Sequence, residues 1–275
     1  MGIGAGILGA LSFGAGDFAG AFAARRVGAL TVVAGAHAVG LVLLLIGVAL
    51  VRPPLPSVEV VLLGLGAGVA GFFGLAALFR GMAIGKMGLV SSLSGSASLT
   101  IPLAAGALLG AEIAALQLVG VACVAGAAAA AGGASRDEMG RRALALAAVA
   151  AVSFGSWYVL LDLAAEFGDP LWALTFSRGA SALIASAIVL RRGFDRSAAP
   201  WGIIAVTGVF DVGGNALFVV AGSFVAVGLA AALIGVYPVV TMLLARFVLG
   251  EHLSGLGQVG VALALTGIVL ISIGG

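Results

Sequence analysis

Ten apolar stretches follow one another along this 275-residue chain, and each is long enough to cross the hydrocarbon core of a bilayer, which takes about 20 residues. Only 9% of the residues are charged, whereas a soluble domain carries roughly 25%. Too few charges are therefore available to coat a water-facing surface. The sequence predicts an all-α membrane protein with ten transmembrane helices, which cover residues 3–24, 30–51, 58–79, 87–109, 113–133, 142–162, 171–190, 199–222, 226–249 and 254–273.

The two halves of the chain resemble each other at an offset of 141 residues. "LSFGAGDF" (11–18) aligns with "VSFGSWYV" (152–159), and "LTVVAGAHAVGL" (30–41) aligns with "LWALTFSRGASA" (171–182). The second alignment matches a histidine to an arginine. Because such matches keep the same order and spacing, they indicate an internal duplication.

The duplication predicts an inverted repeat. Each half would cross the membrane five times, an odd number, so the second half must start on the opposite face. Inverted repeats are typical of transporters that bind their substrate near the midplane, between the halves. The predicted organisation is a first five-helix repeat at 1–134, a connecting loop at 135–142 and a second five-helix repeat at 143–275.

Positive charge is distributed very unevenly between the two faces. With ten crossings, the loops on the face of the termini carry one Lys or Arg, Arg52. Cytoplasmic loops attract positive charge, so the charge count predicts termini outside the cell. The other face carries Arg25, Arg26, Arg80, Lys86, Arg136, Arg141, Arg142, Arg191, Arg192, Arg196 and Arg246.

The last two apolar stretches carry a recognisable pattern, "GVYPVVTMLLARFVLGEHLSGLGQVGVALALTGIVLI" (235–271). A proline, an apolar run, a Gly-Glu pair, then a Gln and a Gly-spaced helix follow in order. A degraded copy, "SLTIPLAAGALLGAEIAALQLVGVACVAG" (98–126), occurs in the first half, where Ala111 splits the Gly-Glu pair. The pattern positions are Pro238, Gly250, Glu251, Gln258, Gly260 and Gly267.

In these residues the chain resembles the ten-span EamA-type transporters of the drug/metabolite transporter superfamily. The resemblance implies two inverted four-helix cores with peripheral fifth and tenth helices, in a bacterial cytoplasmic (inner) membrane. It also implies efflux of small metabolites, amino acids or toxic compounds by alternating access, by a monomer or homodimer. The family would suggest cytoplasmic termini, the opposite of the charge count, so the orientation stays open.

Four ionisable residues lie deep within the predicted helices. A charge at the bilayer centre costs roughly 2.5–3.5 kcal/mol, so each needs a partner or a wet cavity. Counting residues from the arginine-bearing face predicts Asp17 and His37 at one level and Arg178 and Asp211 at another, nearer the midplane. All four are candidate substrate-binding or coupling residues.

Each of these candidates has a functional and a structural interpretation. Asp17 would line the central cavity and exchange a proton or meet a substrate amine; alternatively it is hydrated, or satisfied by His37 or the backbone. His37 is a proton relay or a helix contact. Arg178 would bind a substrate carboxylate with Asp211 as its partner in the empty state, or the two form a fixed ion pair. Asn215 follows Asp211 by one turn and shares its face.

Aromatic and proline residues complete the candidate site. Trp157 and Tyr158 align with Gly16 and Asp17 of the first half and would form a cavity wall or pack. Pro238 should loosen the ninth helix at its middle and act as a hinge near Tyr237, or offer a freed carbonyl as a site contact. Some of the hydroxyls in "SSLSGSASLT" (91–100) are expected to face the cavity.

Several other functions lack their motifs. "GAGVAG" (66–71) fits a dinucleotide-binding pattern, but it lies within an apolar helix. No Walker lysine, metal-ligand cluster or cofactor site is evident, and Cys123 is the single cysteine. We therefore expect a secondary active transporter of small molecules, with proton coupling as an option, rather than an enzyme or a nucleic-acid-binding protein. An uncoupled facilitator and a lipid-modifying membrane enzyme are the alternatives.

Overall fold

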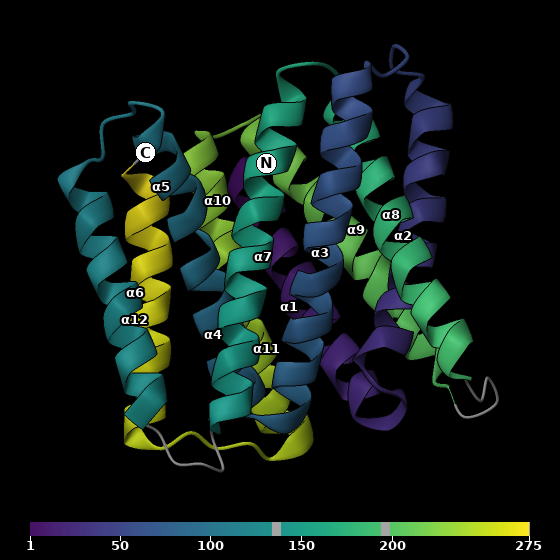
Figure 1. Ribbon diagram of the computed structural model, residues 1–275. Coiled ribbons are helices and arrows are strands. Elements are labelled where there is room, and N and C mark those ends of the chain that lie inside the picture. The colour runs from purple at the N-terminus through teal and green to yellow at the C-terminus, as the bar shows by residue number, and fades with distance from the viewer. Residues whose placement is uncertain (134–138, 194–198, 275) are drawn as a thin grey trace.

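The computed structural model describes residues 1–133, 139–193 and 199–274. Within these residues the chain is helical and has no strand, and ten segments are long and apolar enough to cross a membrane, as predicted (Figure 1). The helices are α1 (Gly2–Val27), α2 (Ala29–Val51), α3 (Val58–Ile84), α4 (Met87–Ser98), α5 (Thr100–Leu108), α6 (Ala115–Gly133), α7 (Arg141–Ala165), α8 (Pro170–Arg192), α9 (Trp201–Gly222), α10 (Val227–Gly235), α11 (Tyr237–Leu249) and α12 (Gly255–Ile273).

Both termini lie at one end of the bundle, as an even number of crossings requires (Figure 1). We call this the terminal end. The α1–α2 turn lies at the opposite end, which we call the Arg-rich end because Arg25, Arg26, Arg191 and Arg192 occupy the last turns of α1 and α8. That turn consists of Gly28 alone, whose φ of 82° suits a residue without a Cβ. Which end faces the cytoplasm stays a prediction.

Half of the predicted connecting loop at 135–142, residues 135–138, falls outside the described residues. The same is true of Arg136 and Arg196, two of the charges counted for orientation. The second half of the described chain starts its first helix at Arg141, one residue before the predicted end of that loop.

Two of the ten spans are each divided into two helices. The fourth span breaks at Leu99, between α4 and α5, and the ninth breaks at Val236, between α10 and α11. Pro102 and Pro238 follow these breaks in the first turn of α5 and α11. A proline is tolerated there because the N–H groups of a helix's first turn have no intrahelical acceptor, so the missing N–H costs no hydrogen bond. The sequence predicted a loosened ninth span; the break in the fourth was not predicted.

The largest helix contacts all join the first half of the chain to the second. They are formed by α3 with α7, α1 with α9, α6 with α12, and α2 with α8. In the α6–α12 pair, at one side of the bundle (Figure 1), a Cβ on Gly267 would lie 3.0 Å from the Gly120 carbonyl oxygen. Glycine at both positions lets the two backbones touch, a common basis of helix association in lipid.

The largest hydrophobic cluster lies toward the Arg-rich end of the bundle, and two smaller clusters lie toward the terminal end. The main hydrophobic cluster includes Phe79 and Met82 of α3 and Val32 and Val33 of α2, and each of these side chains is at most 1% exposed. Its other members likewise come from the halves of their helices nearest the Arg-rich end. At the terminal end, two smaller clusters form around Ala5, Ala221 and Ala230 and around Val60, Ala164 and Ala173, whereas α5 contributes no buried residue. The most extensive packing therefore lies toward the Arg-rich end.

Candidate functional site

Two carboxylates from different halves of the chain line one small pocket. Asp17 of α1 and Asp211 of α9 both line it, together with Ala36 of α2 and Phe79 of α3. Helices α1 and α9 approach closely here: a Cβ on Gly16 would lie 3.1 Å from the Phe210 Cβ. The pocket adjoins the main hydrophobic cluster, to which Phe79 also belongs. The sequence had placed these two carboxylates at different depths, and the structure brings them together.

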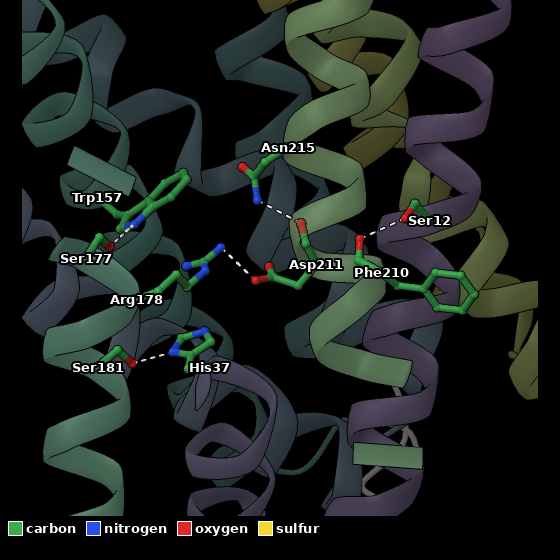
Figure 2. Close-up of polar contacts among 9 residues, drawn as sticks. All are labelled: Ser12, His37, Trp157, Ser177, Arg178, Ser181, Phe210, Asp211 and Asn215. Atoms are coloured by element: carbon green, nitrogen blue, oxygen red, sulfur yellow. Dashed lines mark hydrogen bonds and ion pairs between the residues drawn. The ribbon is translucent and has the colours of Figure 1, made fainter. Parts of the chain in front are cut away.

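Asp211 also forms an ion pair with Arg178 of α8 (Figure 2). The Nη2 of Arg178 lies 2.7 Å from Oδ2 of Asp211, and the two side chains are only 6% and 19% exposed. The contact lacks hydrogen-bond alignment, and the buried Nε of Arg178 has no hydrogen-bond partner among the described residues. Arg178 thus keeps a donor unused in a place where an unmade hydrogen bond is costly.

The indole of Trp157 on α7 adjoins the same arginine. The Arg178 guanidinium carbon lies 5.7 Å from the centre of the Trp157 ring, within the range of a cation–π interaction. Trp157 Nε1 donates a hydrogen bond of 3.0 Å to Ser177 Oγ, which fixes the ring plane (Figure 2). The sequence left open whether Trp157 lines a cavity or packs; the structure shows it in contact with Ser177 and Arg178.

His37 lies near Arg178 but pairs with a serine. The His37 side chain on α2 is buried, and its Nδ1 lies 2.5 Å from the Ser181 Oγ of α8 (Figure 2). Arg178 is its charged neighbour. The alternative in which His37 satisfies Asp17 is not the contact found for Nδ1 of His37, which pairs with Ser181 of α8. His37 therefore links the two halves of the chain.

Tyr158 of α7 lies beside Trp157. Its side chain is 41% exposed. Together with Trp157, against which it packs edge-on at 5.2 Å, it supplies an aromatic surface above the charges.

Tyr237, Pro238 and Asn215 occupy the margin of the site. The Tyr237 hydroxyl lies over Gly95, where a Cβ would be 2.8 Å from it, so a larger residue in α4 would displace it. Pro238 is buried directly after it. Asn215 donates to the backbone carbonyl of Asp211 at 2.8 Å, so its amide nitrogen supports its own helix (Figure 2).

The hydroxyl of Ser91 in α4 differs from those of the other serines in that helix. The sequence analysis named the hydroxyl-rich run at 91–100 but no single residue within it. The Ser91 Oγ is buried and has no hydrogen-bond partner among the described residues, although Asp17 and Tyr237 lie near it. The other serines of α4 donate to carbonyls of their own helix: Ser92 to Leu89, Ser94 to Val90, Ser96 to Leu93 and Ser98 to Gly95. The only signal in the sequence was the run of hydroxyl residues in an apolar helix.

The arrangement suits binding rather than metal chemistry. Among residues 1–133, 139–193 and 199–274, no group of three or more His, Cys, Asp or Glu side chains could hold a metal ion. What the site offers is one guanidinium, two carboxylates, a free hydroxyl and an aromatic wall. Such groups recognise a small molecule that carries charge and an apolar part.

Comparison with known proteins identifies the family. The EamA-like transporter family matches residues 141–273, the second half of the chain. No curated protein matches the chain at a significant level. Thirteen chains of solved structures match it, one of them a crystal structure of a protein with 18% identical residues and a TM-score of 0.62, over 98% of this chain and 96% of the other. That likeness concerns the fold alone. With its ten long apolar helices, the chain is a multi-pass membrane protein whose residues 141–273 belong to the EamA-like transporter family, within the drug/metabolite transporter superfamily.

Proposed function

We propose that this transporter exports small metabolites, amino acids or toxic compounds by secondary active transport with alternating access, across a bacterial cytoplasmic membrane. Its substrate would bind at Asp17, Arg178 and Asp211. The observation that carries this proposal is the buried Arg178, which has an unused Nε and an imperfectly aligned partner. A substrate carboxylate would satisfy the Nε and replace Asp211 as the counter-ion.

The charge balance of the site supports coupling. Asp17 and Asp211 bring two negative charges and Arg178 brings one positive charge, and all three lie within the membrane. Uncompensated charge in a low-dielectric interior is costly. A proton or a cationic group of the substrate would compensate the remaining negative charge. Competition between these two ligands for Asp17 would couple export to the proton gradient.

The symmetry of the packing supports two inverted repeats, residues 1–134 and 143–275. Under the sequence alignment, α1 on α9 corresponds to α7 on α3, and both contacts are extensive. The same alignment relates the His37–Ser181 contact to one between Arg178 and Gly40, where a Cβ would lie 3.8 Å from the arginine Cδ. Two such repeats can rock against each other around a fixed site.

A clamp closes the Arg-rich end. Glu251, after α11, accepts a 2.7 Å hydrogen bond from Arg25 Nη2 of α1 and a 3.0 Å bond from the backbone N–H of Met87 of α4. Glu112, which corresponds to Glu251 in the first-half pattern, is exposed at the terminal end and makes no such contact among the described residues. We infer that this contact holds the Arg-rich end in a way that the first-half glutamate does not repeat at the terminal end.

Removing this clamp should loosen the Arg-rich end. In Glu251→Ala, the backbone amides at the start of α4 should exchange with deuterium about tenfold faster, because hydrogen bonds to a charged group are among the strongest. Hydrogen exchange read by mass spectrometry measures this, with Glu112→Ala as the matched control. Equal exchange in both variants would contradict a clamp at Glu251.

Transport itself tests the proposed function. Purified protein in proteoliposomes should accumulate one or more members of a panel of amino acids, metabolites and toxic cations when a proton gradient is imposed. A proton-coupled transporter concentrates its substrate until the gradient is dissipated by an ionophore. Equilibration without accumulation, unaffected by the gradient, would instead identify an uncoupled facilitator.

A further inference from the structure

A second, larger cleft opens at the Arg-rich end, away from the charged site. It is formed by the α1–α2 turn, the last turns of α3, the start of α7 and the end of α8. Three arginines from three different helices line it: Arg26, Arg80 and Arg192. No Asp or Glu is among the described residues that line it. The cleft is therefore positively charged.

The three arginines are exposed and not neutralised by neighbours in the described part of the chain. The adjacent Arg25 is paired with Glu251, whereas Arg26, Arg80 and Arg192 form no ion pair among the described residues. Arg26 lies over the Phe22 ring, 5.1 Å from its centre, which orients its guanidinium without cancelling its charge. These groups are available to an external anion.

The depth of the arginines matches the polar boundary of a membrane. Arg26 and Arg192 occupy the last turns of α1 and α8. Arg80 lies four residues before the end of α3, which places it about 6 Å deeper at 1.5 Å per residue. An anion held by all three would sit at the level where lipid phosphates lie.

Beyond the arginines, toward the membrane interior, the walls of the cleft are formed by apolar side chains. Phe73 of α3 and Val149 of α7 line it and are 54% and 47% exposed. In a ten-span membrane protein, exposed apolar side chains on an outer face contact acyl chains. One ligand with a phosphate and an attached hydrocarbon chain would satisfy both parts of the cleft.

We propose that this cleft binds an anionic phospholipid, with its phosphate between Arg26, Arg80 and Arg192 and an acyl chain along Phe73 and Val149. Basic pockets between membrane helices on the cytoplasmic side recognise anionic lipid headgroups in this way. The site is separate from the substrate pocket, and the proposal does not depend on the transport mechanism.

Native mass spectrometry of the detergent-solubilised protein tests the proposal. The protein is titrated with dioleoylphosphatidylglycerol and, in parallel, with the neutral dioleoylphosphatidylcholine. The native chain should bind the anionic lipid in preference to the neutral one. Each of Arg26→Gln, Arg80→Gln and Arg192→Gln should weaken anionic-lipid binding about fivefold, and the triple variant on the order of 100-fold.

A matched control uses two exposed arginines from the same end that do not line the cleft. Arg141→Gln with Arg142→Gln should leave the preference for the anionic lipid unchanged. If the control and the triple variant lost the preference for the anionic lipid equally, the proposal would be overturned. The preference would then come from nonspecific electrostatic attraction to the Arg-rich end. Displacement of the lipid by millimolar inorganic phosphate would also overturn it, because the cleft would then hold a free anion. The single variants keep the test decisive if the triple variant fails to fold.

Discussion

Replacing Arg178 with glutamine is expected to abolish transport and to lower the stability of the protein by about 3–5 kcal/mol. The loss of stability follows because Asp211 would keep a buried negative charge without its partner. The loss of transport follows from the proposed contact between the guanidinium and a substrate carboxylate. Thermal unfolding in detergent and uptake into proteoliposomes measure the two effects separately.

The double variant Arg178→Gln with Asp211→Asn separates a substrate site from a fixed scaffold. Without either charge, no unpaired ion remains, so most of the lost stability should return. Transport should stay absent, because no guanidinium is available to the substrate. A double variant that is stable and transports normally would show that the pair only holds α8 and α9 together. Asn215→Ala is a control next to the pair that keeps both charges.

Replacing Asp17 with asparagine is expected to uncouple transport from the proton gradient. Asparagine keeps the size and polarity of the side chain but removes the second carboxylate beside Asp211. The site then carries one negative and one positive charge, and no proton is needed to balance it. Accumulation against a gradient should fall to the background level, whereas exchange of internal for external substrate should continue. Radiolabelled exchange in proteoliposomes, with and without an imposed pH difference, measures both.

Ser91→Ala serves as the control for Asp17. The serine lies near the same carboxylate but carries no charge, so its removal should weaken binding without removing coupling. Unchanged coupled transport in Asp17→Asn would remove Asp17 from the mechanism, and the site would reduce to Arg178 and Asp211. Loss of exchange as well as coupling would instead assign Asp17 to substrate binding.

The membrane class and the ten spans could be predicted because lipid imposes a simple rule. Each crossing needs about 20 apolar residues, so the crossings can be counted along the chain. The ten long apolar helices of the structure lie where the sequence predicted them. Pro238 predicted the loosened ninth span for a local reason, its missing N–H. The break at Leu99 had a weaker signal, since Pro102 lies three residues beyond it.

The contacts within the site could not be predicted, because they depend on how each helix is rotated and tilted against its neighbours. Counting residues gives depth along one axis only. It predicted Asp17 and His37 at one level and Asp211 at another, whereas Asp17 and Asp211 line the same pocket. The structure pairs His37 with Ser181 because α2 packs on α8. A serine within an apolar helix gives no sign of which neighbour it will meet.

The interleaved packing of the two halves has a consequence for how the protein is made. The most extensive partners of α1, α2, α3 and α6 are α9, α8, α7 and α12, all of which are synthesised later. A chain emerging from the ribosome thus inserts its first five crossings before any of their main partners exists. These early helices remain in the bilayer without their main packing partners. The finished structure therefore assembles only once translation is nearly complete. A truncated message would therefore leave unassembled helices for the quality-control proteases rather than a working half.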